Sequence, residues 1–394
     1  MELILDNLYS PTHLVSHPIT KDLYITDQLG YIYRVTKERK ETELWLDLTD
    51  LIIPLNPNYD ESGLLSIEFS SDGDQLFLFS SRPVTLFPKE GFLFVLKGLN
   101  RQSKDLHVDV ISMIPLENGN PLLDEEIIYF GILRDQRNHH GGKLAYLDDY
   151  LYISIGDGGG SRDPYQRAQD LTCVAGKILR IVPSREGSAS PMRKCCASTT
   201  SYYIPENPFI NTEKINGSSL FIDEDDIIPE IYAYGFRNPW SLTYSPFHET
   251  FFIGDVGQED VEEIDLLVES GNYGWSVKEG SQYTPWLKRQ DNAGNGENFI
   301  DPIFEYPHRE DGISAVIGGY YISGNPRYPE GYYLADILGP VMRIVDEEGE
   351  WHLDKTWDLD DDEMIQGWGY DGDYLYLLMG SQDKQGYVAR ILSF

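Results

Sequence analysis

NHHGGKLAYLDDYLYISIGDGGGSRDPYQRAQDLTCVAGKILR, residues 138–180, is the stretch that decides the fold. It begins with an amide, two histidines and two glycines, and it continues as an alternating strand over 151–155. The strand ends in a loop with four glycines among residues 156–160. A polar, glycine-rich corner of this kind brings carbonyls and carboxylates in front of a sheet, where a histidine can take up a proton near neutral pH. Taken alone, the same residues also fit an ordinary β-turn beside an incidental histidine pair.

The rest of the chain repeats this pattern of short alternating strands split by turns. Turns with the pattern D-x-x-G or D-G-D recur at 27–30, 72–74 and 371–373. Short strands at such regular spacing predict an all-β sandwich, barrel or propeller. The predicted strands are 23–26, 31–35, 64–69, 75–80, 92–96, 143–147, 150–155, 177–182, 241–244, 250–253, 261–268, 319–322, 332–336, 341–345, 374–378 and 387–391.

The domain organisation is predicted to be simple, with one domain over residues 1–394 and no linker. A chain of this length is often a single large all-β domain. Few segments read as helical, and long insertions are expected at 100–137, 184–203 and 282–299. Residues 184–201 are small, polar and locally basic, so we expect a mobile loop at about this position.

The charge of the chain limits the classes of partner that it is expected to bind. Its 31 basic and 65 acidic side chains give a formal net charge of −34. Nucleic acids and anionic membranes bind through positive charge, so we expect neither as a partner. An acidic chain favours cations such as calcium wherever carboxylates and carbonyls converge.

The cysteines and the N-terminus give weaker signals. Cys173, Cys195 and Cys196 are too few for a disulfide framework, and whether Cys173 pairs with Cys195 or Cys196 stays open. The N-terminal residues are acidic with only a short apolar run, so we expect no signal peptide. No segment approaches the ~20 apolar residues of a membrane-spanning helix. The compartment is left open.

A second block, PEIYAYGFRNPWSLTYSPFHETFFIGDVGQEDVEEIDLLVESGNYGWSVKEG, occupies residues 229–280. Shorter motifs accompany the two blocks: ESGLL at 61–65, GKILRI at 176–181, PENPF at 205–209, PIFEYPH at 302–308 and GGY at 318–320. In this order they resemble the family of soluble pyrroloquinoline-quinone (PQQ)-dependent glucose/sorbosone (aldose) dehydrogenases. That family includes bacterial glucose and aldose dehydrogenases and the propeller of hedgehog-interacting protein.

The resemblance covers residues 8–394 and implies a six-bladed β-propeller with long loop insertions. The last strand is then expected to close the ring with N-terminal strands. The implied chemistry is oxidation of the C1 hydroxyl of an aldose, with PQQ and Ca²⁺ as cofactors. The partners would be a small sugar substrate and an electron acceptor.

The resemblance also assigns residues to roles. His139 matches the catalytic histidine, which acts as the base. Arg237 and Asn238 match residues at the quinone, and an always-charged guanidinium suits both quinone oxygens and carboxylates. Gly257 and Gln258 match positions whose backbone carbonyls bind calcium.

Other positions are assigned to the substrate side of the same site. Glu61 matches a family position near the substrate, and Asn138 and Gln169 are placed beside it. Asp157, in the glycine-rich loop, is expected to line the same mouth. His140 stands where the family usually has an amide, so it could shift the pKa of its neighbour or compete as a ligand.

The sequence departs from the family at two positions that commonly carry a basic residue for a cofactor carboxylate. Ser323 stands at the first and Val341 at the second. Losing two charged hydrogen bonds of roughly 1.5–3 kcal/mol each would weaken the cofactor by ~10²–10⁴-fold. Arg343 follows Val341 by two residues, and Arg327 or Lys288 could substitute from a loop.

Two functions therefore remain. The first is a PQQ-dependent sugar dehydrogenase. The second is a catalytically inactive propeller that binds a protein or glycan, as hedgehog-interacting protein does, with a partner that presents a basic face. The departures at Ser323 and Val341 favour the second, whereas the intact histidine, arginine and glycine motifs favour the first.

Overall fold

The computed structural model describes residues 1–38, 41–57, 59–88, 92–188, 200–209, 214–215, 218–219, 227–286, 298–309, 314–359, 363–381 and 385–394. Strands dominate these residues, and the helical elements among them are two 3₁₀ turns, Val84–Leu86 and Leu123–Glu125. Within the same ranges, no helix has the length and apolar character needed to cross a membrane.

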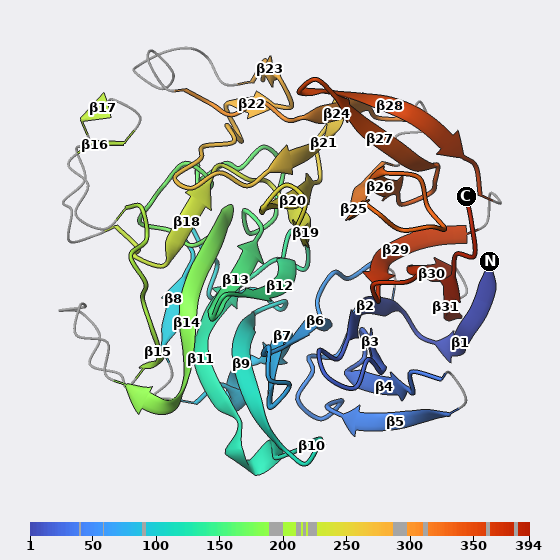
Figure 1. The fold of residues 1–394 in the computed structure, drawn as a ribbon. Helices are drawn as coiled ribbons and strands as arrows, with labels where there is room; N and C mark the ends of the chain where they lie inside the picture. The colour runs from blue at the N-terminus through green and yellow to red at the C-terminus, as the bar shows by residue number, and fades with distance from the viewer. Residues whose placement is uncertain are drawn as a thin grey trace.

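Six sheets surround a central axis as the blades of a propeller (Figure 1). Blade 1 is β2 (Pro11–Ser16), β3 (Leu23–Asp27), β4 (Tyr31–Val35) and β5 (Thr42–Asp47). Blade 2 is β6 (Leu64–Phe69), β7 (Gln75–Pro83), β9 (His107–Glu117), β11 (Ile127–Arg134) and the edge strand β8 (Leu93–Val95), with β10 (Asn120–Pro121) beside β9. Blade 3 is β12 (Gly141–Leu147), β13 (Tyr150–Ile155), β14 (Lys177–Ser188), β15 (Thr200–Tyr203) and β18 (Ile231–Tyr234).

The second half of the chain builds the other three blades. Blade 4 is β19 (Pro239–Ser245), β20 (Thr250–Asp255), β21 (Val261–Leu266) and β24 (Phe304–Pro307). Blade 5 is β25 (Val316–Ile322), β26 (Gly331–Asp336), β27 (Val341–Glu347) and β28 (Glu350–Trp357). Blade 6 is β29 (Glu363–Tyr370), β30 (Leu375–Ser381), β31 (Gly386–Arg390) and β1 (Glu2–Leu8). Two short pairs, β16–β17 (Lys214–Ile215, Ser218–Ser219) and β22–β23 (Lys278–Glu279, Gln282–Tyr283), lie outside the blades.

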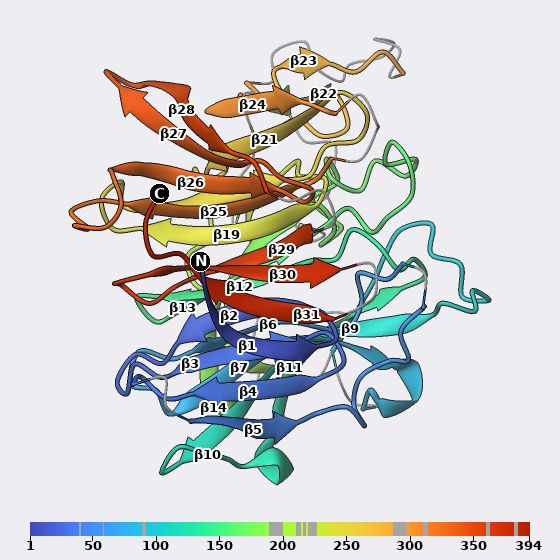
Figure 2. The same ribbon diagram turned by 90° about the vertical axis from the view of Figure 1, so that its right-hand side faces the viewer.

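The ring closes as predicted. β1, from the N-terminus, pairs antiparallel with β31 from the C-terminus, with Leu5 opposite Val388. Figures 1 and 2 both show the two ends of the chain side by side at this blade. This pairing places the first strand in the last blade and so joins the two ends of the ring.

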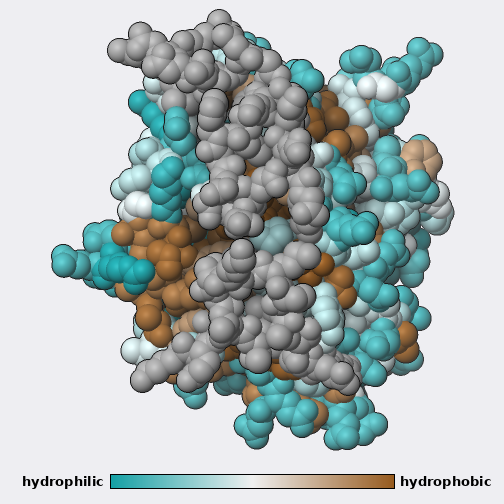
Figure 3. All heavy atoms as spheres, turned by 90° about the vertical axis from the view of Figure 1, so that its left-hand side faces the viewer, coloured by the Kyte–Doolittle hydropathy of each residue, from teal (hydrophilic) through white to brown (hydrophobic). Residues whose placement is uncertain are grey.

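The blades pack through alternating apolar side chains. Phe252 of blade 4 stacks on Tyr332 of blade 5 with ring centroids 4.5 Å apart, and Phe77 of blade 2 stacks on Tyr146 of blade 3 at 5.2 Å. Such rings stabilise the contact between blades through the apolar area that they bury and through the favourable geometry of the ring pair. Outward-facing positions are mainly hydrophilic, and Figure 3 shows this on one side of the ring, where an apolar patch interrupts the polar surface.

The innermost strand of each blade lies against its neighbours on both sides. These strands are β2, β6, β12, β19, β25 and β29, and the contacts run in that order and back to β2. They therefore form a wall around the axis, and any space on the axis is lined by residues from several blades.

One predicted insertion is wrong. Residues 100–137 contain β9 and β11, which are central strands of blade 2. β9 is buried along most of its length, on both faces, so the alternation at its first four residues does not continue along the strand and the sequence did not mark it as one.

The other loop predictions are only partly covered. β14 continues to Ser188 and β15 begins at Thr200, so residues 184–188 and 200–201 of the predicted mobile loop belong to strands. Its remainder lies outside the described residues and stays a prediction. Cys195 and Cys196 also lie outside them, and Cys173 is a buried, free thiol.

Candidate active site

A cavity of about 720 Å³ lies on the propeller axis. The inner strands supply part of its wall: Thr12 from β2, Leu65 from β6, Trp240 from β19, Ile317 from β25 and Gln366 from β29. Loops between the strands supply the rest. The volume is in the range of sites that enclose a small molecule or a cofactor.

Most of the predicted site residues meet at this cavity. Its lining includes Glu61, His139, Arg237, Asn238, Gly257 and Gln258. These six residues come from loops that are far apart in the sequence, and the propeller brings them together.

Two predicted substrate residues do not line the cavity. The Gln169 side-chain amide donates to Asn272 Oδ1 at 2.9 Å and to the Trp275 carbonyl at 2.7 Å, so it holds two loops together. Asn138 contributes its carbonyl to Arg134 at 3.0 Å. Both residues therefore support the loops behind the cavity.

His139 is held in one tautomer. Arg237 Nη2 lies 3.0 Å from His139 Nε2, and a guanidinium can only donate, so Nε2 accepts with its lone pair. The proton must then sit on Nδ1, which donates to Asp157 Oδ1 at 2.7 Å. The imidazole is thus neutral, with its basic nitrogen on the arginine side that lines the cavity.

Asp157 is the buried anchor of this histidine. Burial alone would raise the pKa of the Asp157 carboxyl, but the hydrogen bond from His139, the positive charge of Arg237 and the hydrogen bond from the Gly159 N–H hold that pKa below its ordinary value. Trp275 Nε1 and the Gly159 N–H also donate to this carboxylate, both at 2.9 Å. The aspartate is therefore ionised and fixed.

The glycine-rich loop allows this close approach. A Cβ on Gly156 would lie 2.1 Å from the carbonyl oxygen of His139, so no other residue fits there without a backbone shift. His139 itself has a positive φ of 54°, a conformation that side-chain-bearing residues rarely adopt. The position of His139 therefore depends on a local backbone conformation that requires glycine at position 156.

Arg237 and Asn238 are positioned by one carboxylate. Asp255 accepts the N–H of Arg237 at 2.8 Å and that of Asn238 at 2.6 Å, and burial raises the pKa of Asp255 to about 7. The Arg237 guanidinium donates to the Val256 carbonyl at 2.8 Å through Nη1. Its Nε is buried and has no hydrogen-bond partner among the described residues, so this donor is available to a ligand.

Glu61 forms hydrogen bonds to both His139 and Asn238. Its Oε2 accepts the N–H of His139 at 2.7 Å and the side-chain amide of Asn238 at 3.4 Å. Its Oε1 accepts a hydrogen bond from the Tyr59 hydroxyl at the cavity lip. A carboxylate here suits hydroxyl groups of a ligand, which donate to it.

The predicted calcium loop is held from behind by an acid. The N–H groups of Gln258, Glu259 and Asp260 all donate to Glu279 Oε1, at 2.7, 2.7 and 2.9 Å. A Cβ on Gly257 would lie 1.7 Å from the Val261 carbonyl, so the loop requires glycine. Since the N–H groups are engaged by Glu279, oxygen atoms are the groups that this loop can offer to a hard cation.

None of the described substitute cations reaches the cavity. Ser323 donates to Glu330 at 2.6 Å, and Val341 is buried in the core between blades 5 and 6. Arg343 pairs with Asp354, Arg327 lies over the ring of Tyr374 at 4.3 Å, and Lys288 falls outside the described residues. Among the lining residues that the structure describes, Arg237 is the only arginine or lysine.

His308 is a lining residue to which sequence reasoning gave no role. Its Nε2 lies 2.8 Å from Glu262 Oε1, and this hydrogen bond raises the pKa of His308. His308 is the last residue of the PIFEYPH motif. That motif supported the family resemblance but assigned no chemical role to the histidine.

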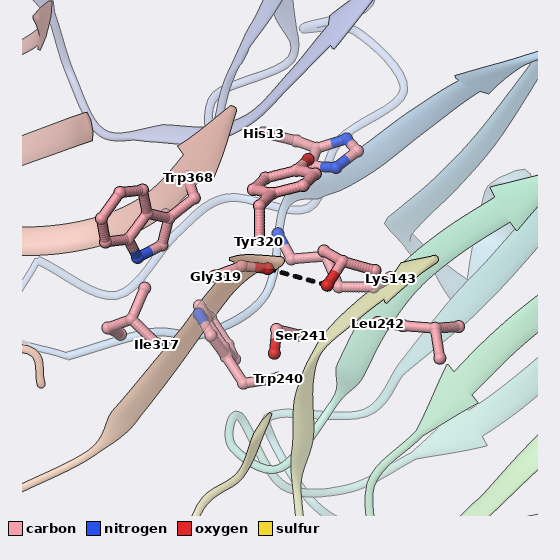
Figure 4. A pocket seen from close by; sticks show the side chains of 11 residues that line it. His13, Lys143, Trp240, Ser241, Leu242, Ile317, Gly319, Tyr320 and Trp368 are labelled. Carbon is pink, nitrogen blue, oxygen red and sulfur yellow. Dashed lines mark hydrogen bonds between the residues drawn. The ribbon is translucent and has the colours of Figure 1, made fainter. Parts of the chain in front are cut away.

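A small pocket of about 20 Å³ shares Trp240 and Ile317 with the cavity. Lys143, Tyr320 and Trp368 are among the residues that line this pocket (Figure 4). Lys143 Nζ donates to the Thr12 carbonyl at 2.7 Å, and burial lowers its pKa to about 7.

Comparisons with known proteins agree with this architecture. The family described as Glucose / Sorbosone dehydrogenase matches residues 56–197 and 210–325. The HIPL1 protein of Arabidopsis thaliana is 36% identical over 217 residues, which are 51% of this chain but only 29% of that relative. The matched region therefore spans less than a third of that relative.

Two solved structures share the fold. The aldose sugar dehydrogenase of Escherichia coli in its apo form is 19% identical and superposes with a TM-score of 0.69, over 99% of this chain and 98% of that one. The PQQ-bound aldose sugar dehydrogenase of Streptomyces coelicolor is also 19% identical, with a TM-score of 0.65 over 98% and 96% of the two chains. At this identity the likeness shows the fold alone.

Proposed function

The chain belongs to the glucose/sorbosone dehydrogenase family, and from that premise we propose that it is a quinoprotein-type sugar oxidoreductase. The substrate would be an aldose, oxidised at its C1 hydroxyl to the lactone. The observation that carries this proposal is the neutral His139, whose Nε2 lone pair is set on the cavity side by Asp157 and Arg237.

The residues of this chain would divide the work as follows. When bound, PQQ supplies the two-electron oxidant and Ca²⁺ the Lewis acid. His139 Nε2 would accept the hydroxyl proton, which requires Arg237 Nη2 to give up its hydrogen bond to that nitrogen. Asp157 would then stabilise the imidazolium, because its carboxylate already accepts the Nδ1 proton. Glu61 would orient the sugar through its hydroxyl groups.

The site has features that fit the cofactors. The buried Arg237 Nε without a partner, beside Asn238, suits a quinone oxygen or a carboxylate. Gly257 and Gln258 lie on the cavity wall, in a loop whose N–H groups are already engaged. The PQQ-bound relative of the same fold supports the choice of quinone.

Calorimetric titration of the calcium-loaded protein with PQQ tests the proposal, followed by dye reduction with several aldoses. Micromolar binding that is lost in R237A, but kept in R343A, is expected. Arg343 is a matched control because its guanidinium pairs with Asp354, away from the cavity. Absence of turnover with bound PQQ and calcium across the aldoses would refute the enzymatic role.

A second candidate is a binding propeller without catalysis. The observation that favours it is the single permanent cation in the described cavity wall, since PQQ carries three carboxylates. The net charge of −34 points the same way, toward a protein or glycan partner with a basic face. This candidate predicts no quinone binding, so tight stoichiometric binding in the titration above would argue against it.

A further inference from the structure

Behind the cavity, blade 2 carries a fully buried polar cluster. His107 and Asp109 alternate along β9, so they share one face of the sheet. Arg134 on β11 lies directly opposite His107, and Ser81 on β7 lies opposite Asp109. Cross-strand pairing therefore gathers these side chains at one end of the blade, against the start of blade 3.

His140, the first residue after His139, completes the cluster. Its Nδ1 donates to Asp109 Oδ2 at 2.8 Å, and Ser81 donates to Asp109 Oδ1 at 2.7 Å. Arg134 Nη1 lies 3.5 Å from Asp109 Oδ2. His140 thus points to Asp109 and away from the cavity. In this position it does not compete with His139 as a ligand in the cavity.

The cluster has the donor types of a metal site, because ligand atoms of His107, Asp109 and His140 all lie within 4.8 Å of one another. Two features argue against a metal ion. The 2.8 Å between His140 and Asp109 is a hydrogen-bond distance that leaves no place for an ion between them. The buried Arg134 guanidinium already supplies a positive charge, and a divalent ion would add a second cation to a fully buried cluster.

The guanidinium has a second set of contacts. Arg134 Nη2 donates to the His139 carbonyl at 2.7 Å and to the Asn138 carbonyl at 3.0 Å. These carbonyls flank the residue with the positive φ, which needs support from its surroundings. On the opposite side the N–H of His139 donates to Glu61.

We propose that Arg134, whose guanidinium lies 3.5 Å from the Asp109 carboxylate, is the positioning residue for His139. It holds the backbone at residues 138–139 so that the imidazole meets Asp157 on one side and the cavity on the other. His140 ties the same segment to Asp109, which explains why an imidazole can stand where the family usually has an amide. The expected effect of Arg134 on catalysis rests on the proposed function, whereas its effect on the backbone and the orientation of His139 does not.

The test is NMR of the histidine side chains in the full chain, labelled with ¹⁵N-histidine. In the wild type, the Nδ1 proton bonded to Asp157 should give a slowly exchanging downfield resonance, assigned by its loss in H139Q. In R134M we expect this resonance to disappear or to broaden by exchange. R134K keeps a charged donor beside Asp109 and should retain it.

The matched control is R82M. Arg82 is another buried arginine of blade 2, paired with Glu126 and bonded to Ser80 and Ser112, so its loss also removes a buried cation. It does not touch residues 138–140, and the His139 resonance should survive in it. Should R134M not fold, the double variant D109N/R134M removes both charges together and carries the same expectation.

Two results would overturn the inference: a His139 resonance that persists in R134M or the double variant, or its equal loss in R82M. Addition of Zn²⁺ should leave the His107 and His140 resonances in place, and a stoichiometric shift would refute Arg134 as the cation of the cluster. If the protein oxidises sugars, R134M should also lower kcat at least tenfold with KM changed less than threefold. A wild type with the resonance but no turnover would count against the proposed function alone.

Discussion

Lys143 is expected to make the stability of the protein depend on pH above neutrality. Burial lowers the pKa of its amine from 10.5 to about 7 in the folded protein, whereas the unfolded chain keeps the ordinary value. Between these two pKa values the unfolded state binds more protons, so native stability rises with pH. From about pH 7 to about pH 9.5, this linkage amounts to about 3 kcal/mol of unfolding free energy.

The substitution K143M removes the titrating group while keeping the length of the side chain. The wild type should therefore gain about 3 kcal/mol relative to K143M between these two pH values, as measured by urea unfolding. Glu68, whose pKa burial raises to about 8, is present in both proteins and drops out of the difference. K97M is the control, because Lys97 is largely exposed and its difference should stay flat. A wild-type-minus-K143M difference that does not change with pH would refute the buried, neutral amine.

Three further changes probe the cavity. D157N should lower kcat for sugar oxidation by ~10²-fold or more, because His139 loses the carboxylate that fixes its tautomer, while PQQ affinity by calorimetry stays within tenfold. G257A should weaken calcium-dependent PQQ binding at least tenfold, since its Cβ would lie 1.7 Å from the Val261 carbonyl; calcium titration by calorimetry measures this. S323K should leave PQQ affinity within about twofold, because Ser323 lies outside the cavity wall, and a strong gain in the same titration would contradict that placement.

Alternation and turn chemistry were enough to place most strands. β6 and β13 have the predicted bounds, and both alternate between turns that the sequence marks clearly. β9 and β11 were missed because both are buried on both faces along most of their length, so neither has a polar, solvent-facing side that continues along the strand. Six blades came from the family resemblance, since the chain has no clear internal repeat.

Side-chain partners explain which of the predicted site residues line the cavity and which do not. His139 and Arg237 follow motifs in which the backbone itself is constrained, so the motif fixes the direction of the side chain. Gln169 lies in the same loop as Asp157, but its amide finds Asn272 instead of the cavity. Short-range sequence proximity does not encode that choice, which depends on blade 4 lying next to blade 3.

The balance of charge in the cavity decides between the two functions. PQQ brings three negative charges, the described wall adds the carboxylates of Asp60 and Glu61, and Arg237 is its only permanent cation, so net negative charge remains to be offset. A calcium ion at Gly257 and Gln258 would offset two of these charges, which makes the metal a condition for cofactor binding and not an accessory to it. We therefore expect EDTA to abolish PQQ binding in calorimetry and added calcium, but not sodium of equal ionic strength, to restore it. Binding that is equally tight in EDTA would mean that other cations hold the carboxylates, and no binding with calcium would leave the binding propeller as the function.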